Sequence, residues 1–397
     1  MTSYLAVFLA AAATTFVVTP LVRRLVVAAG AIDQPSDRKV HPNPTPTLGG
    51  IAMFMGFIAG LAASRFLPFF AEVNAASPEP LAIVVTCALM VGLGIIDDTR
   101  GVSALAKAAA QIFIAGVLVL LGVQLAYFPM PGGPQGIQVV VLSVDLAVVL
   151  TILWVVVVAN AVNLVDGLDG LAAGIVAIAA VVFFVYMVRS PSLFDDASQA
   201  ASLSAITAGI CVGFLPWNFH PAKIFMGDTG AMLLGMLLAT ATISGVGRTP
   251  VPPTPGDLAV VFTAVLSPLL VLFVPFLDVV LAVIRRTRRG ESIGHADKEH
   301  LHHRLMDIGH GHRQAVLLMY LWSALLAASG LAIGLIDGRA AVGIVLLVAL
   351  VLFVVTAGPR VTERRRNGVS PQASREPGSG GTDGEHTLRR TGTKPPR

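Results

Sequence analysis

Charged residues are scarce in this chain, and cysteine is nearly absent. Asp, Glu, Lys and Arg make up 13% of the 397 residues, against roughly 25% in soluble domains. This scarcity excludes an ordinary soluble domain, and we expect no nucleic-acid partner. The two cysteines, Cys87 and Cys211, each lie inside an apolar stretch. Neither disulfide nor zinc chemistry is indicated, and we expect both thiols to pack in the core.

Long apolar runs take the place of the missing charges. Hydrophobic residues reach 55% of the chain, and a membrane-spanning helix needs about 20 apolar residues. We therefore predict an all-α polytopic membrane protein with about 11 transmembrane helices. The eleven candidate spans are approximately 3–22, 48–70, 80–96, 104–122, 140–159, 168–188, 200–216, 229–247, 258–284, 315–335 and 340–357.

The composition changes after the last span. Residues 1–357 are predicted to form one transmembrane domain, whereas residues 358–397 are rich in Arg, Gly, Ser, Thr and Pro and are predicted to be a disordered basic cytoplasmic tail. Lys and Arg concentrate on cytoplasmic loops. With the N-terminus outside, the helical domain has 14 such residues on cytoplasmic segments and 4 on outer loops, so we predict that orientation. Residues 129–137 then form a turn outside, with a small extracytoplasmic β-hairpin.

Four polar motifs interrupt the apolar pattern, and the span count places all of them on the cytoplasmic face. They are Asp97-Asp98, residues 160–170, Gly227–Gly230 and His295–Arg304. Carboxylates are costly in hydrocarbon and suggest function where they occur. Acids, amides, histidines and arginines that converge on one surface indicate a metal–phosphate site in a cytoplasmic cleft.

The acid pair Asp97-Asp98 closes the third span. The alternative is a solvated turn at a helix end, but the helix dipole disfavours two acids there. Lys107 and Gln111 lie four residues apart and therefore on one helix face. Lys107 either reaches the membrane interface or turns inward toward a phosphate, and the sequence leaves both possibilities open.

Oxygen ligands recur every three residues at Asn160, Asn163, Asp166 and Asp169. Such ligands suit Mg²⁺, and the alternative is a polar seam of hydrogen bonds between helices. Asp228 precedes the eighth span, where it either caps the helix or binds a divalent cation that bridges it to a phosphate. We favour the metal in both cases.

Arginines, lysines and histidines gather in residues 285–314, which fits a cationic lid over a diphosphate. A di-iron histidine box is rejected, because such sites need several histidine clusters. Two other polar residues are assigned structural roles. Asp278 lies inside the ninth span, and His220 is expected to pack in the aromatic belt beside Trp217.

Taken in order, these motifs resemble the polyprenyl-phosphate N-acetylhexosamine-1-phosphate transferase family (glycosyltransferase family 4) over residues 1 to about 357. The resemblance is carried by Asp33–His41 leading to Thr47–Gly50, Asp97-Asp98 with Lys107, Asn160–Gly170, and Phe225–Asp228. The run Lys298–Arg304 is similar to the bacterial UDP-N-acetylglucosamine branch. The three consecutive histidines of the UDP-N-acetylmuramoyl-pentapeptide branch are absent.

The resemblance implies an enzyme of the bacterial plasma membrane. A polyprenyl phosphate, decaprenyl or undecaprenyl, would attack the β-phosphate of UDP-GlcNAc and release UMP, as the first membrane step of cell-envelope polysaccharide synthesis. The implied partners are these two substrates and membrane lipids, and a homodimer stays open. Another UDP-hexosamine such as UDP-MurNAc-pentapeptide is the alternative donor. A secondary transporter is the alternative class.

The resemblance also implies roles for individual residues. Asp228 and Asn163 would bind Mg²⁺, for which Mn²⁺ could substitute, and Asp169 would lie near the uracil. The implied catalytic residues are Asp97, Asp98, Lys107, Asp166 and His302. The implied substrate-binding residues are Arg38, Lys39, His41, Asn160, Asp169, Phe225, His295, His300, His303 and Arg304.

Overall fold

The computed structural model describes six stretches of the chain and a few further positions. These are residues 1–34, 44–71, 78–131, 137–189, 199–246 and 311–335, with residues 343, 347, 348, 350 and 351. All of them belong to one unit, Met1–Leu352. The predicted boundary between the helical domain and the tail, at residue 357, lies outside these ranges and stays a prediction.

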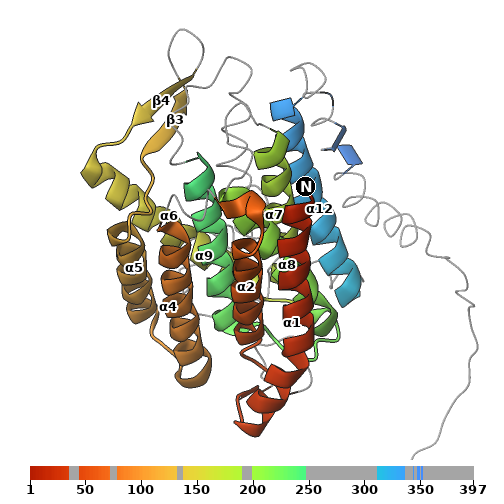
Figure 1. Ribbon diagram of the computed structural model, residues 1–397. Helices are drawn as coiled ribbons and strands as arrows, with labels where there is room; N and C mark the ends of the chain where they lie inside the picture. Colours follow the sequence, from red (N-terminus) through yellow and green to blue (C-terminus); the bar gives the residue numbers. More distant parts are fainter. Residues whose placement is uncertain are drawn as a thin grey trace, which may run out of the picture. The chain divides into compact units, whose positions relative to one another are not determined.

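Helices dominate the described residues (Figure 1). Nine of the eleven predicted spans coincide with a helix there, whereas the predicted spans 258–284 and 340–357 lie wholly or largely outside these residues. A short 3-10 helix, η1, covers Pro68–Phe70. The α-helices are α1 (Thr2–Ala28), α2 (Gly50–Arg65), α4 (Glu79–Arg100), α5 (Ala104–Leu120), α6 (Val144–Val165), α7 (Leu171–Arg189), α8 (Gln199–Asn218), α9 (Gly227–Val246) and α12 (His312–Leu335).

Within the described residues, five helices are long and apolar enough to cross a membrane, namely α1, α4, α6, α7 and α8. Helices α2 and α5 are apolar but shorter. Large apolar side chains such as Leu5, Leu9 and Val17 on α1 are exposed, as expected for a helix that faces lipid. The chain is therefore a multi-pass membrane protein. Cys87 and Cys211 are buried and unbridged, so the prediction that they pack in the core is confirmed.

Two helices extend beyond the apolar runs from which they were predicted. Helix α4 continues to Arg100 and α6 to Val165, whereas the predicted spans end at 96 and 159. Hydropathy changes where side chains become polar, but backbone hydrogen bonding does not stop there. Asp97 and Asn163 therefore lie inside helical turns rather than in loops, which fixes the direction of their side chains.

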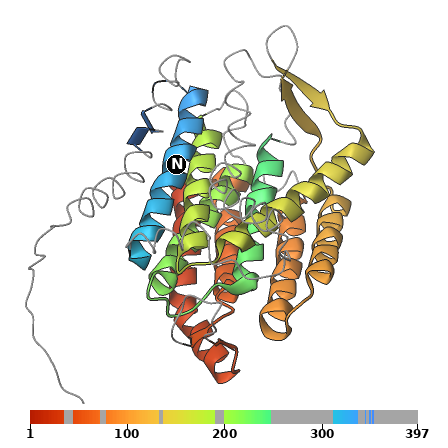
Figure 2. The same ribbon diagram turned by 180° about the vertical axis from the view of Figure 1, so that it is seen from behind.

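Helix α9 is the central element, packed against α2, α4, α6 and α8 (Figure 1). Residues 229–243 of this helix are buried. Small residues permit the close approach, because a Cβ at Gly94 of α4 would clash with the backbone of Thr229 in α9, and a Cβ at Gly235 of α9 would clash with Ala159 of α6. On the far side, α12 packs against α7 (blue in Figure 2). This packing sets the first turn of α9 beside α4 and α6.

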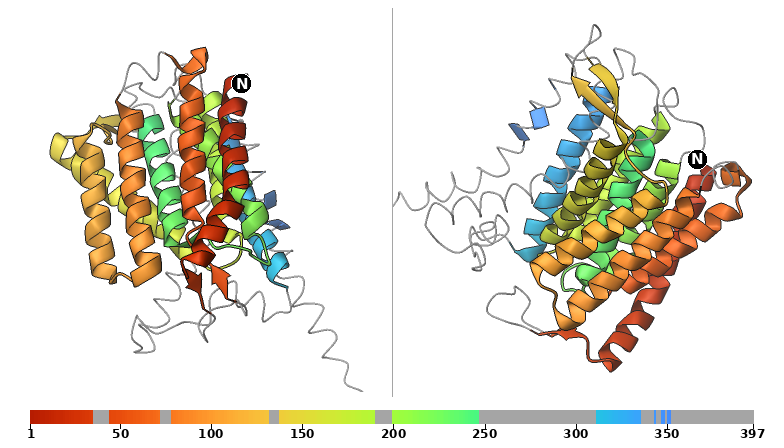
Figure 3. Two further views of the ribbon diagram at one scale, coloured as in Figure 1. Left: turned by 60° about the horizontal axis from the view of Figure 1, so that its bottom comes forward. Right: turned by 90° about the vertical axis from the view of Figure 1, so that its left-hand side faces the viewer.

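Two short strand pairs lie at opposite ends of the helices (Figure 3). Strand β1 (Ile32–Asp33) pairs antiparallel with β2 (Thr45–Pro46). Strand β3 (Tyr127–Pro131) pairs antiparallel with β4 (Ile137–Val141). The second pair connects the end of α5 to the start of α6, in the region where the sequence predicts a hairpin. Its side of the membrane stays a prediction.

The end of the molecule that carries β1 and β2 also holds the polar motifs. Near the end of α1, Arg23 Nε donates to the carbonyl of Lys223, in the segment between α8 and α9, at 2.9 Å. The backbone N–H of Phe225 in that segment donates to the Pro46 carbonyl at 2.8 Å. Met1 lies at the other end of α1 and so at the opposite end of the molecule, where β3 and β4 also lie (Figure 3).

Candidate active site

The link between α4 and α5 places Asp97 next to Lys107. Gly101 ends α4 with φ 71°, a left-handed conformation that glycine adopts without strain, and the Ser103 hydroxyl caps the first turn of α5. Asp97 Oδ1 accepts the Val102 N–H at 2.8 Å. Its other oxygen, Oδ2, lies 2.7 Å from Lys107 Nζ. The two ends of one short turn thus form an ion pair.

Lys107, on α5, also contacts α9 and α6. Its Nζ lies 3.1 Å from Asp228 Oδ1 on α9 and donates to Asn163 Oδ1 on α6 at 3.4 Å. Asn163 Nδ2 in turn donates to Asp228 Oδ1. The Lys107 side chain is only 14% exposed. Of the two possibilities that the sequence leaves open for this lysine, the structure shows the inward one.

Asp98 holds the first turn of α9, where backbone N–H groups lack partners within the helix. Its Oδ1 accepts the Asp228 N–H at 2.9 Å, and its Oδ2 accepts the Thr229 N–H at 3.1 Å and the Thr229 hydroxyl at 2.7 Å. A Cβ at Gly227, which has φ 69°, would clash with the Asp98 carboxylate. The cap of α9 is therefore a carboxylate of α4, and the side chain of Asp228 is left to face Lys107.

One helical turn before Asn163, Asn160 takes part in a separate interaction. Its Nδ2 donates to Gln111 Oε1 on α5 at 2.6 Å and to the Val156 carbonyl at 2.8 Å. Gln111 is fully buried. The polar seam considered from the sequence therefore exists at Asn160, whereas Asn163 joins the Asp228 cluster. The substrate-binding role of Asn160 stays a prediction.

Asp166 ends α6 at the edge of the same cluster. Desolvation by burial, with the carboxylates of Asp228, Asp98 and Asp169 nearby, raises the pKa of Asp166 to about 8. Burial is the larger cause, and the neighbouring negative charge adds to it. A positive charge brought among these carboxylates would relieve it.

The ligand chemistry of the cluster fits a hard divalent cation. Asp97, Asp98, Asp166 and Asp228 contribute four carboxylates, of which Asp97 and Asp228 contact Lys107. Carboxylate and amide oxygens are what Mg²⁺ prefers. In this structure Asn163 presents its amide nitrogen to Asp228 and its oxygen to Lys107. A shared ion would need that amide oxygen turned toward Asp228.

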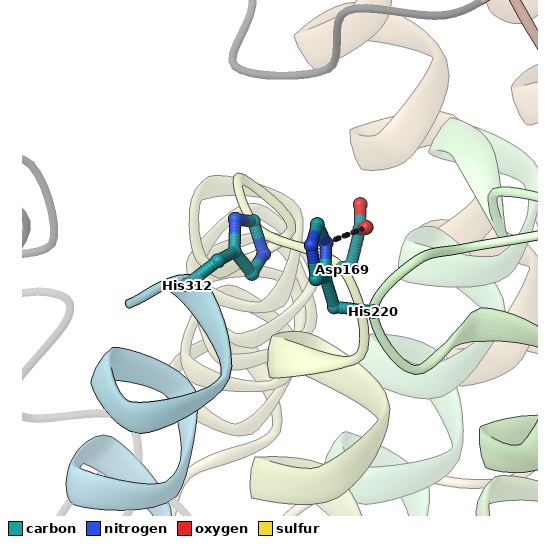
Figure 4. Close-up of side chains that lie close together, drawn as sticks. All are labelled: Asp169, His220 and His312. Atoms are coloured by element: carbon teal, nitrogen blue, oxygen red, sulfur yellow. Dashed lines mark hydrogen bonds and ion pairs between the residues drawn. The ribbon is translucent and has the colours of Figure 1, made fainter. Parts of the chain in front are cut away.

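Asp169, His220 and His312 form a second polar cluster (Figure 4). His220 Nδ1 lies 2.7 Å from Asp169 Oδ2, and the His220 ring stacks on His312 with centroids 4.1 Å apart. The prediction that His220 packs in an aromatic belt was wrong, since its partners are a carboxylate and an imidazole. The available signal was its position in the short segment between two buried helices, just before Asp228.

The remaining predicted site residues divide into two groups. Phe225 lies in the segment between α8 and α9, where its carbonyl accepts the Gly49 N–H at 2.9 Å and places it at the same end as Asp228. The others fall outside the described residues, so their roles stay predictions. They are Arg38, Lys39, His41, His295, His300, His302, His303 and Arg304, and the structural role expected for Asp278 falls there as well.

Comparison with known proteins gives a family match over the centre of the chain. The family described as glycosyl transferase family 4 matches residues 80–246. That range contains every residue of the two polar clusters except His312.

Similarity to individual proteins covers more of the chain. The decaprenyl-phosphate N-acetylglucosaminephosphotransferase of Mycolicibacterium smegmatis is 42% identical over 356 residues, which are 87% of this chain and 86% of the relative. The protein of the same name from Mycobacterium tuberculosis is 41% identical over 326 residues, 80% of each chain. The probable undecaprenyl-phosphate N-acetylglucosaminyl 1-phosphate transferase of Bacillus subtilis is 34% identical over 314 residues, 79% of this chain and 80% of the relative.

Proposed function

We propose, since the chain belongs to glycosyl transferase family 4, that it transfers GlcNAc-1-phosphate from UDP-GlcNAc to a polyprenyl phosphate and releases UMP. The names of its relatives support both substrates. The structural observation that carries the proposal is the junction of Asp97, Lys107, Asn163 and Asp228, where four helices bring carboxylates, an amide and an ammonium group together.

The reaction replaces one phosphoanhydride by another. An oxygen of the polyprenyl phosphate bonds to the β-phosphorus of UDP-GlcNAc, and the bond from that phosphorus to the bridging oxygen breaks. UMP leaves with the bridging oxygen. Phosphoryl transfer of this kind depends on positioning and on charge neutralisation more than on covalent chemistry. An ammonium group held among acids at a helix junction, as Lys107 is, supplies a preorganised charge.

Asp97 acts as a positioning residue in this proposal rather than as a general base. The second pKa of a phosphate monoester lies near 6, so the lipid phosphate is already largely dianionic at pH 7 and has little proton to lose. Both oxygens of Asp97 are engaged, one by the Val102 N–H and one by Lys107. The carboxylate thereby orients the ammonium group toward Asp228.

The same cluster would hold Mg²⁺, or Mn²⁺ in its place, with Asp228 and the Asn163 oxygen as ligands. The bound ion would act as a Lewis acid on the diphosphate. The excess of carboxylates, with the raised pKa of Asp166, supports this proposal. Asp98 contributes by fixing the first turn of α9 and hence the Asp228 backbone.

We place the site at the cytoplasmic interface. The Lys and Arg distribution supports an outer N-terminus, and Met1 and β3–β4 lie at the end of the helices opposite β1–β2 (Figure 3). UDP-GlcNAc is water-borne, whereas the lipid phosphate lies at headgroup level. A site at the ends of helices, near one membrane surface, is accessible to both.

The experiment uses the purified full chain with UDP-GlcNAc, decaprenyl phosphate and Mg²⁺, with UMP release as the measurement. We expect release that stops with chelator and returns with added Mg²⁺. A donor panel that includes UDP-MurNAc-pentapeptide tests the alternative substrate. Counterflow of substrate in sealed vesicles without UMP release would instead indicate a transporter. That class is less favoured, because transporters hold substrates near the bilayer midplane.

A further inference from the structure

Three segments distant in sequence meet at the second polar cluster (Figure 4). Asp169 comes from the turn between α6 and α7, His220 from the segment between α8 and α9, and His312 from the first residue of α12. Arg313 Nε adds a hydrogen bond to the His220 carbonyl at 2.9 Å. The start of α12 is therefore fixed to the segment that leads into Asp228.

The two histidines and the carboxylate have the composition of a metal site, but their geometry argues against one. An ion bound by an imidazole nitrogen lies close to the plane of that ring, about 2.0–2.1 Å from the nitrogen for zinc. The His220 and His312 rings are nearly parallel, with an interplanar angle of 17° and centroids 4.1 Å apart. Two stacked rings in this arrangement cannot both point a lone pair at one ion.

The contacts instead fix one oxygen of Asp169. Its Oδ2 receives His220 Nδ1 at 2.7 Å and the Ala222 N–H at 3.1 Å. A carboxylate accepts and cannot donate, so His220 carries its proton on Nδ1. The Asp169 side chain is 11% exposed. For its other oxygen, Oδ1, the described residues provide no hydrogen-bond partner.

We propose that His220 is a positioning residue for the nucleotide sugar and that it acts through Asp169. It holds the carboxylate so that Oδ1 accepts a hydrogen bond from an N–H or O–H group on an uncharged part of the donor. The diphosphate is excluded as the partner, because a carboxylate repels it. His312 covers the ring face of His220 and restricts its rotation. The inference rests on the proposed function for the identity of the ligand.

The geometry predicts an effect on donor binding rather than on the chemical step. The reacting phosphates belong at Lys107 and Asp228, on other helices, and this network does not contact either of them. Loss of an interaction present in both the ground state and the transition state raises KM and leaves kcat unchanged. Loss of one hydrogen bond to a charged group corresponds to an affinity change of about tenfold.

The test compares two variants that differ only in where the side-chain amide lies. In His220→Asn the amide nitrogen occupies about the position of Nδ1, whereas in His220→Gln it lies one bond farther along. The measurement is the Kd of UDP-GlcNAc by calorimetry on the full chain in detergent. We expect a Kd within about threefold of wild type for Asn and a rise of about tenfold for Gln. Lys223→Met, in the same segment, is the control and should keep the wild-type Kd.

A double-mutant cycle then tests whether His220 acts through Asp169. If it does, adding His220→Gln to Asp169→Asn weakens binding no further than Asp169→Asn alone. Equal Kd values for the Asn and Gln variants would overturn the inference, as would additive losses in the cycle. Because Kd is measured without turnover, a wild-type chain that binds UDP-GlcNAc but releases no UMP would contradict the proposed function and not this inference.

Discussion

Replacing Asp97 by Asn distinguishes a positioning carboxylate from a general base. The amide keeps the shape of the side chain and one acceptor oxygen, so it can still receive either the Val102 N–H or Lys107. It loses the charge-assisted contact with Lys107 at 2.7 Å. Such a hydrogen bond contributes about 1.5–3 kcal/mol. At about 1.36 kcal/mol per tenfold change in rate, the expected loss in kcat is roughly 10- to 150-fold.

The assay is UMP release at saturating substrates between pH 5 and pH 9. If the lipid phosphate supplies its own dianion, the acid limb of the rate profile follows a pKa near 6 and persists in Asp97→Asn. Asp97→Ala, which also frees the Val102 N–H, should be slower than Asp97→Asn. A loss beyond about 10⁴-fold together with the disappearance of the acid limb would refute this reasoning, because it would make Asp97 the proton acceptor.

Two further predictions concern stability in detergent. Gly94→Ala should lower the free energy of unfolding by about 1–3 kcal/mol, because the added Cβ meets the Thr229 backbone. Gly92→Ala on the same helix is the control and should leave the free energy of unfolding unchanged, because its Cβ meets nothing within 4 Å. Equal Tm values for the two variants would contradict the close approach of α4 and α9. The pKa of Asp166 is raised to about 8, above the usual value of about 3.9, so the folded chain holds a proton that the unfolded chain loses. Stability should then fall as the pH rises from about 4 to 8 without divalent cations. Asp166→Asn should flatten that fall in thermal melts, and an unchanged slope would contradict the assignment to Asp166.

The sequence predicts the helices well and the role of individual polar residues less well. Apolar runs determine which segments span a membrane, so each of the nine α-helices named above coincides with a predicted span. The ends of α4 and α6 were placed too early, because hydropathy reports the environment of side chains and not backbone hydrogen bonds. Periodicity did place Lys107 and Gln111 on one face, and both contact α6.

Contacts between distant segments are what the sequence does not reveal. Asp97 and Asp98 are adjacent acids in the sequence, yet the Asp98 carboxylate caps α9 and the Asp97 carboxylate pairs with Lys107. The role of each carboxylate depends on the rotation of α4 against α9, and the close approach at Gly94 sets that rotation. His220 was misassigned for the same reason, since its partners lie 51 and 92 positions away in the chain.

The most direct test of the central claim is UMP release by Asp228→Asn, compared with Asp145→Asn. Both changes replace a carboxylate by an amide, but Asp228 lies in the polar cluster on α9, whereas Asp145 is exposed in the first turn of α6, at the β3–β4 end. The account predicts that Asp228→Asn inserts into the membrane and loses transfer, while Asp145→Asn retains wild-type turnover. Normal turnover by Asp228→Asn would contradict it.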